Sequence, residues 1–324
     1  MAVGLASNFV VRDELANAVY EEELTQFFDI FNAGTNGGVQ LQLEGREGDY
    51  YKRRFFDQIP TSSNARRDTT STAAQTDTAM TQDEIVAVKL SRKFVPYAQT
   101  LDAWEKIGMS NDEMNVHMAK AFADNTKYDI LERVIIVLKN VLGQDPNTVY
   151  DYSATADMAH VALIRGLQLF GDQAGRIICW LGHSKPWFNL MEDSLTVAGG
   201  NVGPAVLYEA SQPTMGRKFV QTDSSNFIVT GTPDDYLTFG LVKDACVVTI
   251  SESRRFVSDL VTGAENLYLR FQGEYAFDIE VKGHAYNFGA GGANPTDVTL
   301  AGAGNWTREV AHLKNGPGIE VRTQ

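Results

Sequence analysis

Residues 61–84 read TSSNARRDTTSTAAQTDTAMTQDE, and this polar stretch decides the expected fold. Met80 is its only large apolar residue, so the stretch offers almost nothing for a core to bury. The segments VQLQLE (39–44) and IVAVKL (85–90) flank it, and each alternates apolar and polar side chains as a strand does. We therefore expect a long projecting hairpin, with these two segments paired and the polar stretch as its tip. Because an isolated hairpin is marginally stable in water, the hairpin is expected to lean on another subunit.

The charge of the chain is unevenly distributed. The sequence has 41 acidic and 28 basic residues, a formal net charge of −13, which argues against a dedicated nucleic-acid binder. Between 46 and 67, however, six basic residues stand against three acidic ones, so this segment is +3 and the remainder is −16. A basic arm can be drawn to the acidic body of a second copy, although a solvated basic face explains the pattern equally well. The candidate contact residues are Arg53, Arg54, Arg66 and Arg67.

Two long elements predict an elongated domain. Residues 110–143 carry apolar side chains at helical spacing, with a capping box that begins at Ser110 and a C-cap at Gly143. Such a helix is about 50 Å long at 1.5 Å per residue. Nearly every odd position from 267 to 281 is apolar, which predicts a strand of similar length with a bend or bulge at Gly273. Since the two elements are far apart in the chain, the residues between them are expected to form an inserted domain.

That insertion, about 145–265, has an α+β pattern. The expected helices cover 153–171 and 184–195, and the expected strands cover 177–181, 226–230, 236–242 and 245–250. A further helix is expected at 12–31 and a last strand near Ile319–Arg322. Cys179 and Cys246 lie in apolar runs, which predicts reduced core residues. No apolar stretch is long enough to span a membrane.

The common signatures of catalysis are missing from the sequence. Ser184 follows Gly182 and His183, but Pro186 stands where a nucleophile elbow needs glycine, so Ser184 is interpreted as a helix N-cap. The five histidines do not show the spacing of metal ligands. The sequence therefore predicts no enzyme, no cofactor and no metal. A soluble hydrolase built around Ser184 is the remote alternative.

Five phrases stand in order along the chain: MTQDEIVAVKL, GHSKPWFNLMEDSL, MGRKFVQTDS, DDYLTFGLVKDACVV and GEYAFDIEVKGHAYN. Together with the element order they resemble the major capsid proteins of tailed bacteriophages, whose Johnson fold herpesvirus shells share. The resemblance implies an α+β fold with an N-terminal arm, an extended β-hairpin loop, a long spine helix with a long β-sheet, and an inserted axial domain. The implied parts are the arm (1–38), the extended loop (39–96), the peripheral domain (97–144 and 266–287), the axial domain (145–265) and a C-terminal return segment in the axial domain (288–324).

The same resemblance implies a function in assembly. Copies of the chain would form the pentamers and hexamers of an icosahedral shell, with each extended loop overlapping a neighbour. The shell would enclose double-stranded DNA without specific binding, since an acidic wall repels phosphate. The virion would assemble in the host cytoplasm. Because the arm begins almost at once, a separate scaffolding protein is expected beside a portal, and cement proteins are left open.

Two alternatives accompany this expectation. Some members of the family crosslink a loop lysine to a neighbour; Lys52 and Lys89 are the lysines of this region, but no motif here supports a crosslink. An encapsulin-type nanocompartment shell shares the fold and is the main alternative to a phage capsid.

Overall fold

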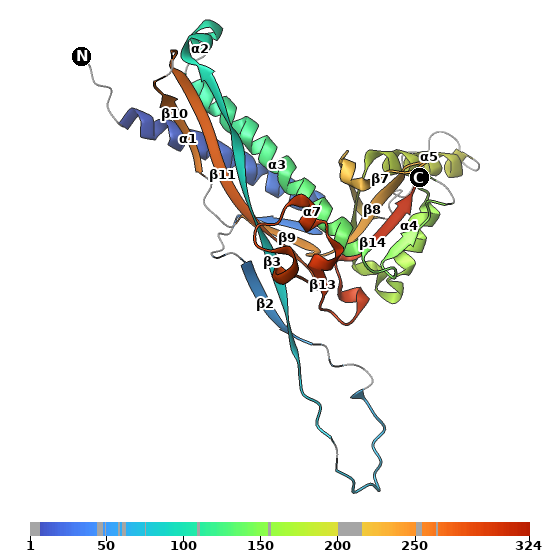
Figure 1. Ribbon diagram of the computed structural model, residues 1–324. Coiled ribbons are helices and arrows are strands. Elements are labelled where there is room, and N and C mark those ends of the chain that lie inside the picture. The colour runs from blue at the N-terminus through green and yellow to red at the C-terminus, as the bar shows by residue number, and fades with distance from the viewer. Residues whose placement is uncertain are drawn as a thin grey trace.

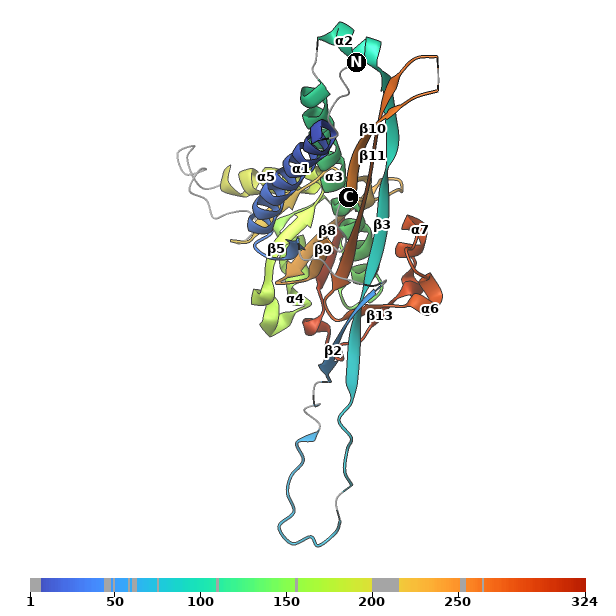
Figure 2. The ribbon, with the colours of Figure 1, turned by 90° about the vertical axis from the view of Figure 1, so that its left-hand side faces the viewer.

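The structure is a computed structural model. It describes residues 7–43, 48, 50–57, 59, 63–74, 76–108, 111–154, 157–199, 216–250, 255–263 and 265–324. Long strands and a long helix form an elongated body, and a second sheet lies at one side of it (Figure 1). The chain between β2 and β3 projects far from both, as two perpendicular views show (Figures 1 and 2).

The described strands form two large sheets and a small ribbon. The first sheet has the order β1-β9-β11-β3-β2 with β10 beside β11, and contains β1 (Val39–Gln42), β2 (Tyr50–Phe56), β3 (Gln82–Thr100), β9 (Cys246–Ile250), β10 (Arg255–Val261) and β11 (Tyr268–Val281). The second has the order β4-β14-β8-β5-β6 with β7 beside β8, and contains β4 (Val149–Asp151), β5 (Ile177–Gly182), β6 (Lys218–Gln221), β7 (Ile228–Val229), β8 (Asp235–Val242) and β14 (Gly318–Thr323). The ribbon pairs β12 (His284–Tyr286) with β13 (Trp306–Arg308).

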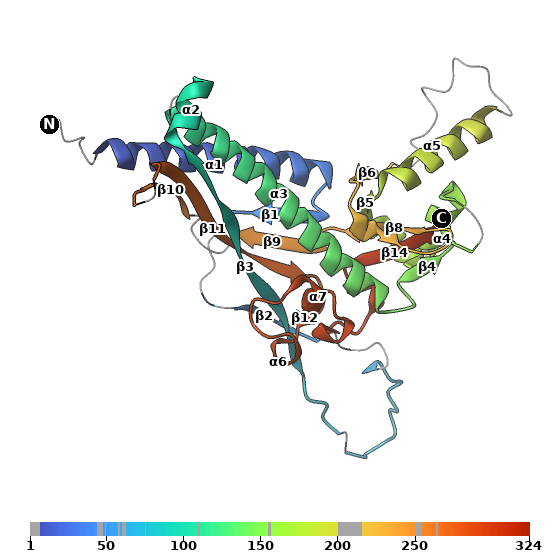
Figure 3. The same ribbon diagram turned by 45° about the horizontal axis from the view of Figure 1, so that its top comes forward.

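Helices cover both sheets. They are α1 (Ser7–Gly34), α2 (Leu101–Ile107), α3 (Asn111–Gly143), α4 (His160–Gln168), α5 (Ser184–Gly199), α6 (Phe288–Gly291) and α7 (Asp297–Leu300). Short 3₁₀ turns occur at Gly171–Arg176, Ser225–Phe227, Ala303–Asn305 and Leu313–Asn315. The long helix α3 runs along the long strands and α1 packs against it (Figure 3). Within the described residues, no helix is long and apolar enough to cross a bilayer.

The long strand predicted at 267–281 is confirmed as β11, and it pairs antiparallel with β3 over most of its length. The bulge predicted at Gly273 is also confirmed, but the extra residue lies on β3. Phe271 pairs with Tyr97 and Gly273 with Phe94, so two residues of β3 stand opposite one of β11. One of those two is Pro96, which has no N–H for a ladder bond and is therefore tolerated at a bulge.

The long helix predicted at 110–143 is confirmed as α3, whereas the proposed cap residue Ser110 lies outside the described residues. Phe122, at 1% exposure, packs its ring 4.4 Å from that of Phe94 and 5.1 Å from that of Phe256. Through these contacts α3 is fixed to β3 and β10. The hydroxyls of Thr126 on α3 and Tyr20 on α1 lie 2.8 Å apart in the same interior.

The helix predicted at 12–31 is confirmed as α1, but the buried face was assigned incorrectly. The side chains it buries are Ala16, Tyr20, Leu24 and Phe28, which repeat every four residues. The helix was predicted from the apolar spacing of Leu15, Val19, Phe27 and Phe31. Of these, Val19, Phe27 and Phe31 are half-buried and flank this face, and the side chain of Leu15 lies outside those that the structure describes. A four-residue repeat places these side chains along one stripe of α1, and this stripe faces α3, where Tyr20 contacts Thr126.

The predicted pairing of the hairpin strands is wrong. β1 pairs parallel with β9, from Val39 opposite Cys246 onward, and takes no part in the projection. The strand that pairs with β3 is β2, with Tyr50 opposite Val88 and Phe56 opposite Gln82. Val39 and Leu41 are fully buried, so β1 belongs in the core, while the projecting hairpin exposes nearly all of β2.

Two strands of the segment expected to form the inserted domain, the predicted strand at 245–250 and an unpredicted strand at 255–261, belong to the first sheet. β9 and β10 both pair with β11, although they lie within the interval 145–265. The predicted strand at 177–181 is confirmed as β5, and the predicted last strand as β14, which lies between β4 and β8. The helix predicted at 153–171 is shorter, because β4 and a turn occupy the chain before His160. The cysteines are free and buried, as predicted.

The C-terminal return segment divides between two places. Its end, β14, lies in the second sheet, but β12, β13 and α6 lie beside β3 near the base of the projection (Figure 3). The segment expected to belong wholly to the axial domain therefore also supports the extended loop. This placement brings residues some 200 positions apart in sequence into contact; the backbone N–H of Ser91 donates to Asn294 Oδ1 at 2.9 Å.

Candidate functional site

The expected bounds of the extended loop, 39–96, include β1, which lies in the core; from here on, the extended loop means residues 57–81, which follow the paired strands β2 and β3 outward. The ladder closes where the Asp57 N–H donates to the Thr81 carbonyl at 3.1 Å, and the Thr81 hydroxyl donates back to the Asp57 carboxylate. Lys52 and Glu84 form an ion pair across the two strands. Beyond this point every described residue from 63 to 82 is exposed. The loop therefore has a fixed root and a solvent-exposed tip.

Contacts with distant parts of the chain hold this root in place. The ring of Tyr50 on β2 lies 4.9 Å from that of Phe288 on α6. Arg53 Nη2 lies 2.6 Å from Glu280 Oε1 on β11, and that carboxylate is almost fully buried. Lys89 is buried and donates to the Gly48 carbonyl at 2.9 Å. Because these contacts come from α6, β11 and β3, they set the direction in which the loop projects.

An ion network fixes the long strands to the helix behind the root. Asp129 on α3 accepts the Tyr275 hydroxyl at 2.7 Å and lies 3.0 Å from Arg133 Nη2. Asp297 on α7 contacts both Arg133 and Arg92 on β3, each at 2.9 Å. Burial and the Asp129 charge raise the pKa of the Tyr275 hydroxyl, which therefore stays a hydrogen-bond donor. The network joins α3, α7, β3 and β11.

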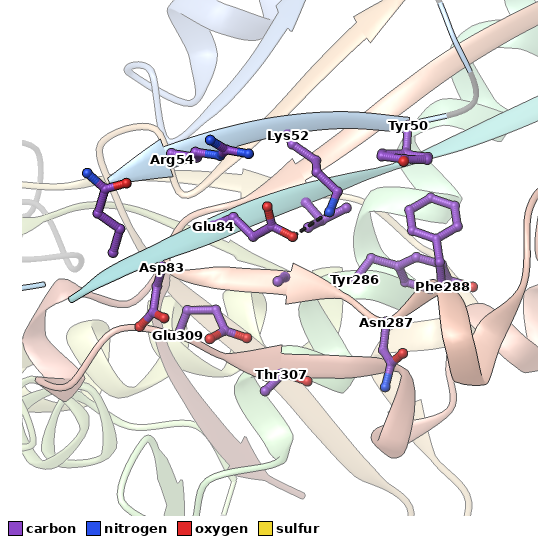
Figure 4. A pocket seen from close by; sticks show the side chains of 13 residues that line it. Tyr50, Lys52, Arg54, Asp83, Glu84, Tyr286, Asn287, Phe288, Thr307 and Glu309 are labelled. Carbon is purple, nitrogen blue, oxygen red and sulfur yellow. Dashed lines mark hydrogen bonds and ion pairs between the residues drawn. The ribbon is translucent and has the colours of Figure 1, made fainter. Parts of the chain in front are cut away.

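A cavity of about 610 Å³ opens beside the root (Figure 4). Its walls are β2, β3, the β12–β13 ribbon and the start of α6. The polar and aromatic side chains that line it include Tyr50, Lys52, Arg54, Asp83, Glu84, Tyr286, Phe288 and Glu309. Figure 4 shows Asp83 and Glu309 close together at one end and the rings of Tyr286 and Phe288 at the other.

The four predicted arginines fall into two pairs. Arg53 is engaged with Glu280, and Arg54 lines the cavity at the root. Arg66 and Arg67 lie in the exposed loop, and neither forms an ion pair with any residue that the structure describes. The sequence analysis thus grouped four arginines that the structure separates. Arg53 and Arg54 form a root pair, and Arg66 and Arg67 form a tip pair in the exposed loop.

Sequence reasoning missed the remaining residues of the root. The run YYKRRFF (50–56) lacks the alternation of a half-buried strand, because both of its faces are largely exposed. Its richness in aromatic residues was the available signal, since aromatic side chains favour strands. Glu309 gave no signal, because only the fold brings it to β3. Lys52 and Lys89, the lysines considered for crosslinking, have the in-chain partners Glu84 and Gly48.

The surroundings of Ser184 fit a helix start rather than a nucleophile. Its backbone N–H donates to Asp223 Oδ1 at 3.3 Å, and the Lys185 N–H donates to His183 Nδ1 at 3.2 Å. His183 and Asp223 therefore cap α5, and the prediction that Ser184 itself is the N-cap is wrong. His183 Nδ1 lies 3.5 Å from Ser184 Oγ, but it already accepts a hydrogen bond from the Lys185 N–H, so it is unsuited to take the proton of the Ser184 hydroxyl.

A second serine–histidine–aspartate set joins α4 to α5. His160 Nδ1 lies 2.7 Å from Asp193 Oδ2, and His160 Nε2 lies 3.3 Å from Ser194 Oγ. The Ser194 hydroxyl also donates to the Leu190 carbonyl of its own helix at 2.8 Å. These contacts therefore hold α4 and α5 together. Among the described residues no cluster of three metal-ligating side chains occurs.

Comparison with known proteins identifies the chain. A family model described as major capsid protein 13-like matches residues 8–320. The structure resembles the Cyanophage Pam1 capsid asymmetric unit, with 12% identity, a TM-score of 0.51, and coverage of 75% of this chain and 84% of that one. It also resembles a structure from Microbacterium phage Oxtober96, with 8% identity, a TM-score of 0.50, and coverage of 89% and 90%. No curated protein matches.

At these identities the structural likeness shows the fold alone, and it confirms the expected Johnson-type capsid fold. The family match supports a phage capsid over a nanocompartment shell and implies a structural rather than an enzymatic role. Because the family model covers nearly the whole chain, the chain belongs to the major capsid protein 13-like family and is a shell component of tailed-phage virions.

Proposed function

We propose that copies of this chain form pentamers and hexamers that close into an icosahedral shell around double-stranded DNA. The observation that carries the proposal is the extended loop: its described part projects away from the body, and every described residue from 59 to 81 is exposed. A segment with so little to bury is ordered only when a partner supplies the contacts. The loop of one subunit would overlap its neighbour in the ring.

The charge distribution supports this contact. Arg66 and Arg67 lie in the loop beyond its root, which in-chain contacts hold in place. The chain as a whole has a formal net charge of −13. A loop that carries positive charge to an acidic neighbour gives a contact between unlike patches, which is the kind that repeats around a ring. Arg53 and Arg54 would act at the root, where Arg53 already pairs with Glu280.

The division into parts belongs to the same proposal. We assign the first sheet with α3 to the peripheral domain, and the second sheet with α4 and α5 to the axial domain that meets other copies at the ring axis. An acidic wall suits a shell that holds DNA without gripping it, because like charge repels phosphate. A scaffolding protein, a portal and assembly in the host cytoplasm remain predictions from the family resemblance.

The experiment reverses the charge of the loop tip. The double variant Arg66→Glu/Arg67→Glu is expected to lower the yield of closed shells by about tenfold or more, since an attractive contact becomes repulsive. Shells are counted by negative-stain electron microscopy after sedimentation, and circular dichroism checks that the subunit is folded. The charge-conserving variant Arg66→Lys/Arg67→Lys is the matched control and should assemble. A normal shell yield from the reversed chain would overturn the assignment of the tip.

A further inference from the structure

The cavity at the root of the loop holds more negative charge than its own cations neutralise. Asp83, Glu84 and Glu309 line it, and Lys52 pairs with Glu84. Within the described part of the chain, neither Asp83 nor Glu309 has an ion-pair partner. Arg54 is the one other cation of the lining, so at neutral pH the carboxylates outnumber the positive charges.

The carboxyl groups at this end of the cavity interact electrostatically with one another. The hydrogen bond that the protonated Asp83 carboxyl donates to Asp57 raises the pKa of Asp83, and burial together with the charges of Asp83, Asp57 and Glu84 raises the pKa of Glu309. Like charges this close disfavour ionisation of the group. A positive charge that entered the cavity from outside would reverse this penalty, so the geometry favours a cationic occupant.

The aromatic wall of the cavity, opposite the carboxylates, indicates which kind of cation would bind. The Phe288 ring lies 4.9 Å from the Tyr50 ring and 5.1 Å from the Tyr286 ring, which forms an aromatic surface next to the carboxylates. A guanidinium group is flat, stacks on aromatic faces and pairs with carboxylates through two parallel N–H groups. Carboxylates beside stacked rings therefore match arginine better than lysine.

We propose that this cavity receives Arg66 and Arg67 of a second copy of the chain, an inference that rests on the proposed function and names its acceptor surface. The chain's own loop projects away from β13, which forms part of the cavity wall (Figures 1 and 2), so the occupant comes from another subunit. A volume of about 610 Å³ is within the range of pockets that enclose drug-sized ligands. A contact from the tip of one subunit to the root of the next repeats head to tail around a ring.

Charge reversal on both sides tests the pairing. The pocket variant Asp83→Arg/Glu309→Arg and the tip variant Arg66→Glu/Arg67→Glu are each expected to lower shell yield by about tenfold or more. The four substitutions combined in one chain restore the attraction, so the combined chain should recover to within about threefold of wild type. Glu265→Arg, which reverses an exposed acidic residue at the far end of β11, is the matched control and should assemble normally.

Mixing the two reversed chains shows that the contact joins different subunits. In a mixture, every contact between unlike chains is attractive, whereas contacts between like chains are repulsive. A six-membered ring can alternate the two chains, whereas a five-membered ring must contain at least one repulsive contact between like chains. Six-membered rings, scored by negative-stain electron microscopy, should therefore form from the mixture but not from either chain alone. Rescue in the combined chain without rescue in the mixture would place the contact within one subunit and overturn the proposal.

Other outcomes also decide the question. If the pocket variant assembles normally, the cavity is not an acceptor and the proposal fails, while the proposed function stands. If the pocket variant fails and the tip reversal does not rescue it, the cavity binds a different partner and the proposal again fails. The neutral variant Asp83→Asn/Glu309→Gln separates loss of contact from misfolding, because it should stay folded by circular dichroism and give an intermediate yield. Absence of shells from the wild-type chain would instead count against the proposed function.

Discussion

Truncation of Phe122 tests whether α3 is fixed to the long strands by its aromatic contacts. Phe122 is 1% exposed, and its ring has three aromatic neighbours: Phe94 at 4.4 Å, Phe256 at 5.1 Å and Tyr97 at 6.1 Å. Removing a fully buried phenylalanine side chain costs about 3–5 kcal/mol, because transfer free energy is lost and a cavity remains. Three neighbouring rings from two strands hinder collapse of that cavity, so Phe122→Ala should fall in the upper half of this range.

The assay is urea unfolding of the unassembled subunit, followed by circular dichroism at fixed concentration. A loss of about 4 kcal/mol lowers the ratio of folded to unfolded chain roughly a thousandfold, which is large beside the total stability of most domains. Phe188→Ala is the matched control: its ring is 61% exposed on α5, so the same truncation should change stability by about 0.5 kcal/mol or less. A loss below about 1 kcal/mol for Phe122→Ala, or an equal loss for both variants, would refute the packing argument.

Three further predictions concern other parts of the chain. Asp129→Asn removes the charge that binds Arg133 and accepts the Tyr275 hydroxyl. It should lower the free energy of unfolding by about 2–3 kcal/mol in the same assay. An unchanged unfolding midpoint would mean that the network adds nothing to stability. Burial raises the pKa of the Cys179 thiol to about 12, so it should resist alkylation at pH 8 until urea exposes it; rapid labelling of the native chain would contradict its burial. Burial and neighbouring carboxylates raise the pKa of Glu309, and an incoming arginine favours its ionised form. Shell contacts should then be strongest above that raised pKa and weaken as pH falls through it, and Glu309→Gln should flatten the dependence; an unaltered pH profile would count against the contact.

The sequence predicted the long elements because each repeats a simple pattern over many residues. The strand at 267–281 alternates almost without interruption, and the helix at 110–143 carries an apolar stripe on both sides of a polar middle turn, so tertiary contacts had little to override. Gly273 also marked the bulge, where the register shifts between Phe271 and Gly273 on β11. The projecting loop was recognised by its lack of apolar residues, which is a local property.

The pairing of strands was not predictable in the same way. Both β1 and β2 are short, and only the distant strand β9 makes β1 part of the core, through a parallel contact that crosses about 200 residues. The root cavity combines β2 and β3 with residues after 284, so its acceptor side chains carry no shared sequence signal. Arg53 shows the same limit: its partner Glu280 is known only once β11 lies beside β3.

Copies of this chain are inferred to close into a shell through the extended loop. Electron cryomicroscopy of the purified wild-type particle tests it most directly. The account predicts closed icosahedral shells in which residues 57–81 of each subunit lie across a neighbour, with the tip at the neighbour's root cavity. Isolated subunits, open aggregates, or shells whose loops contact no neighbouring subunit would contradict it.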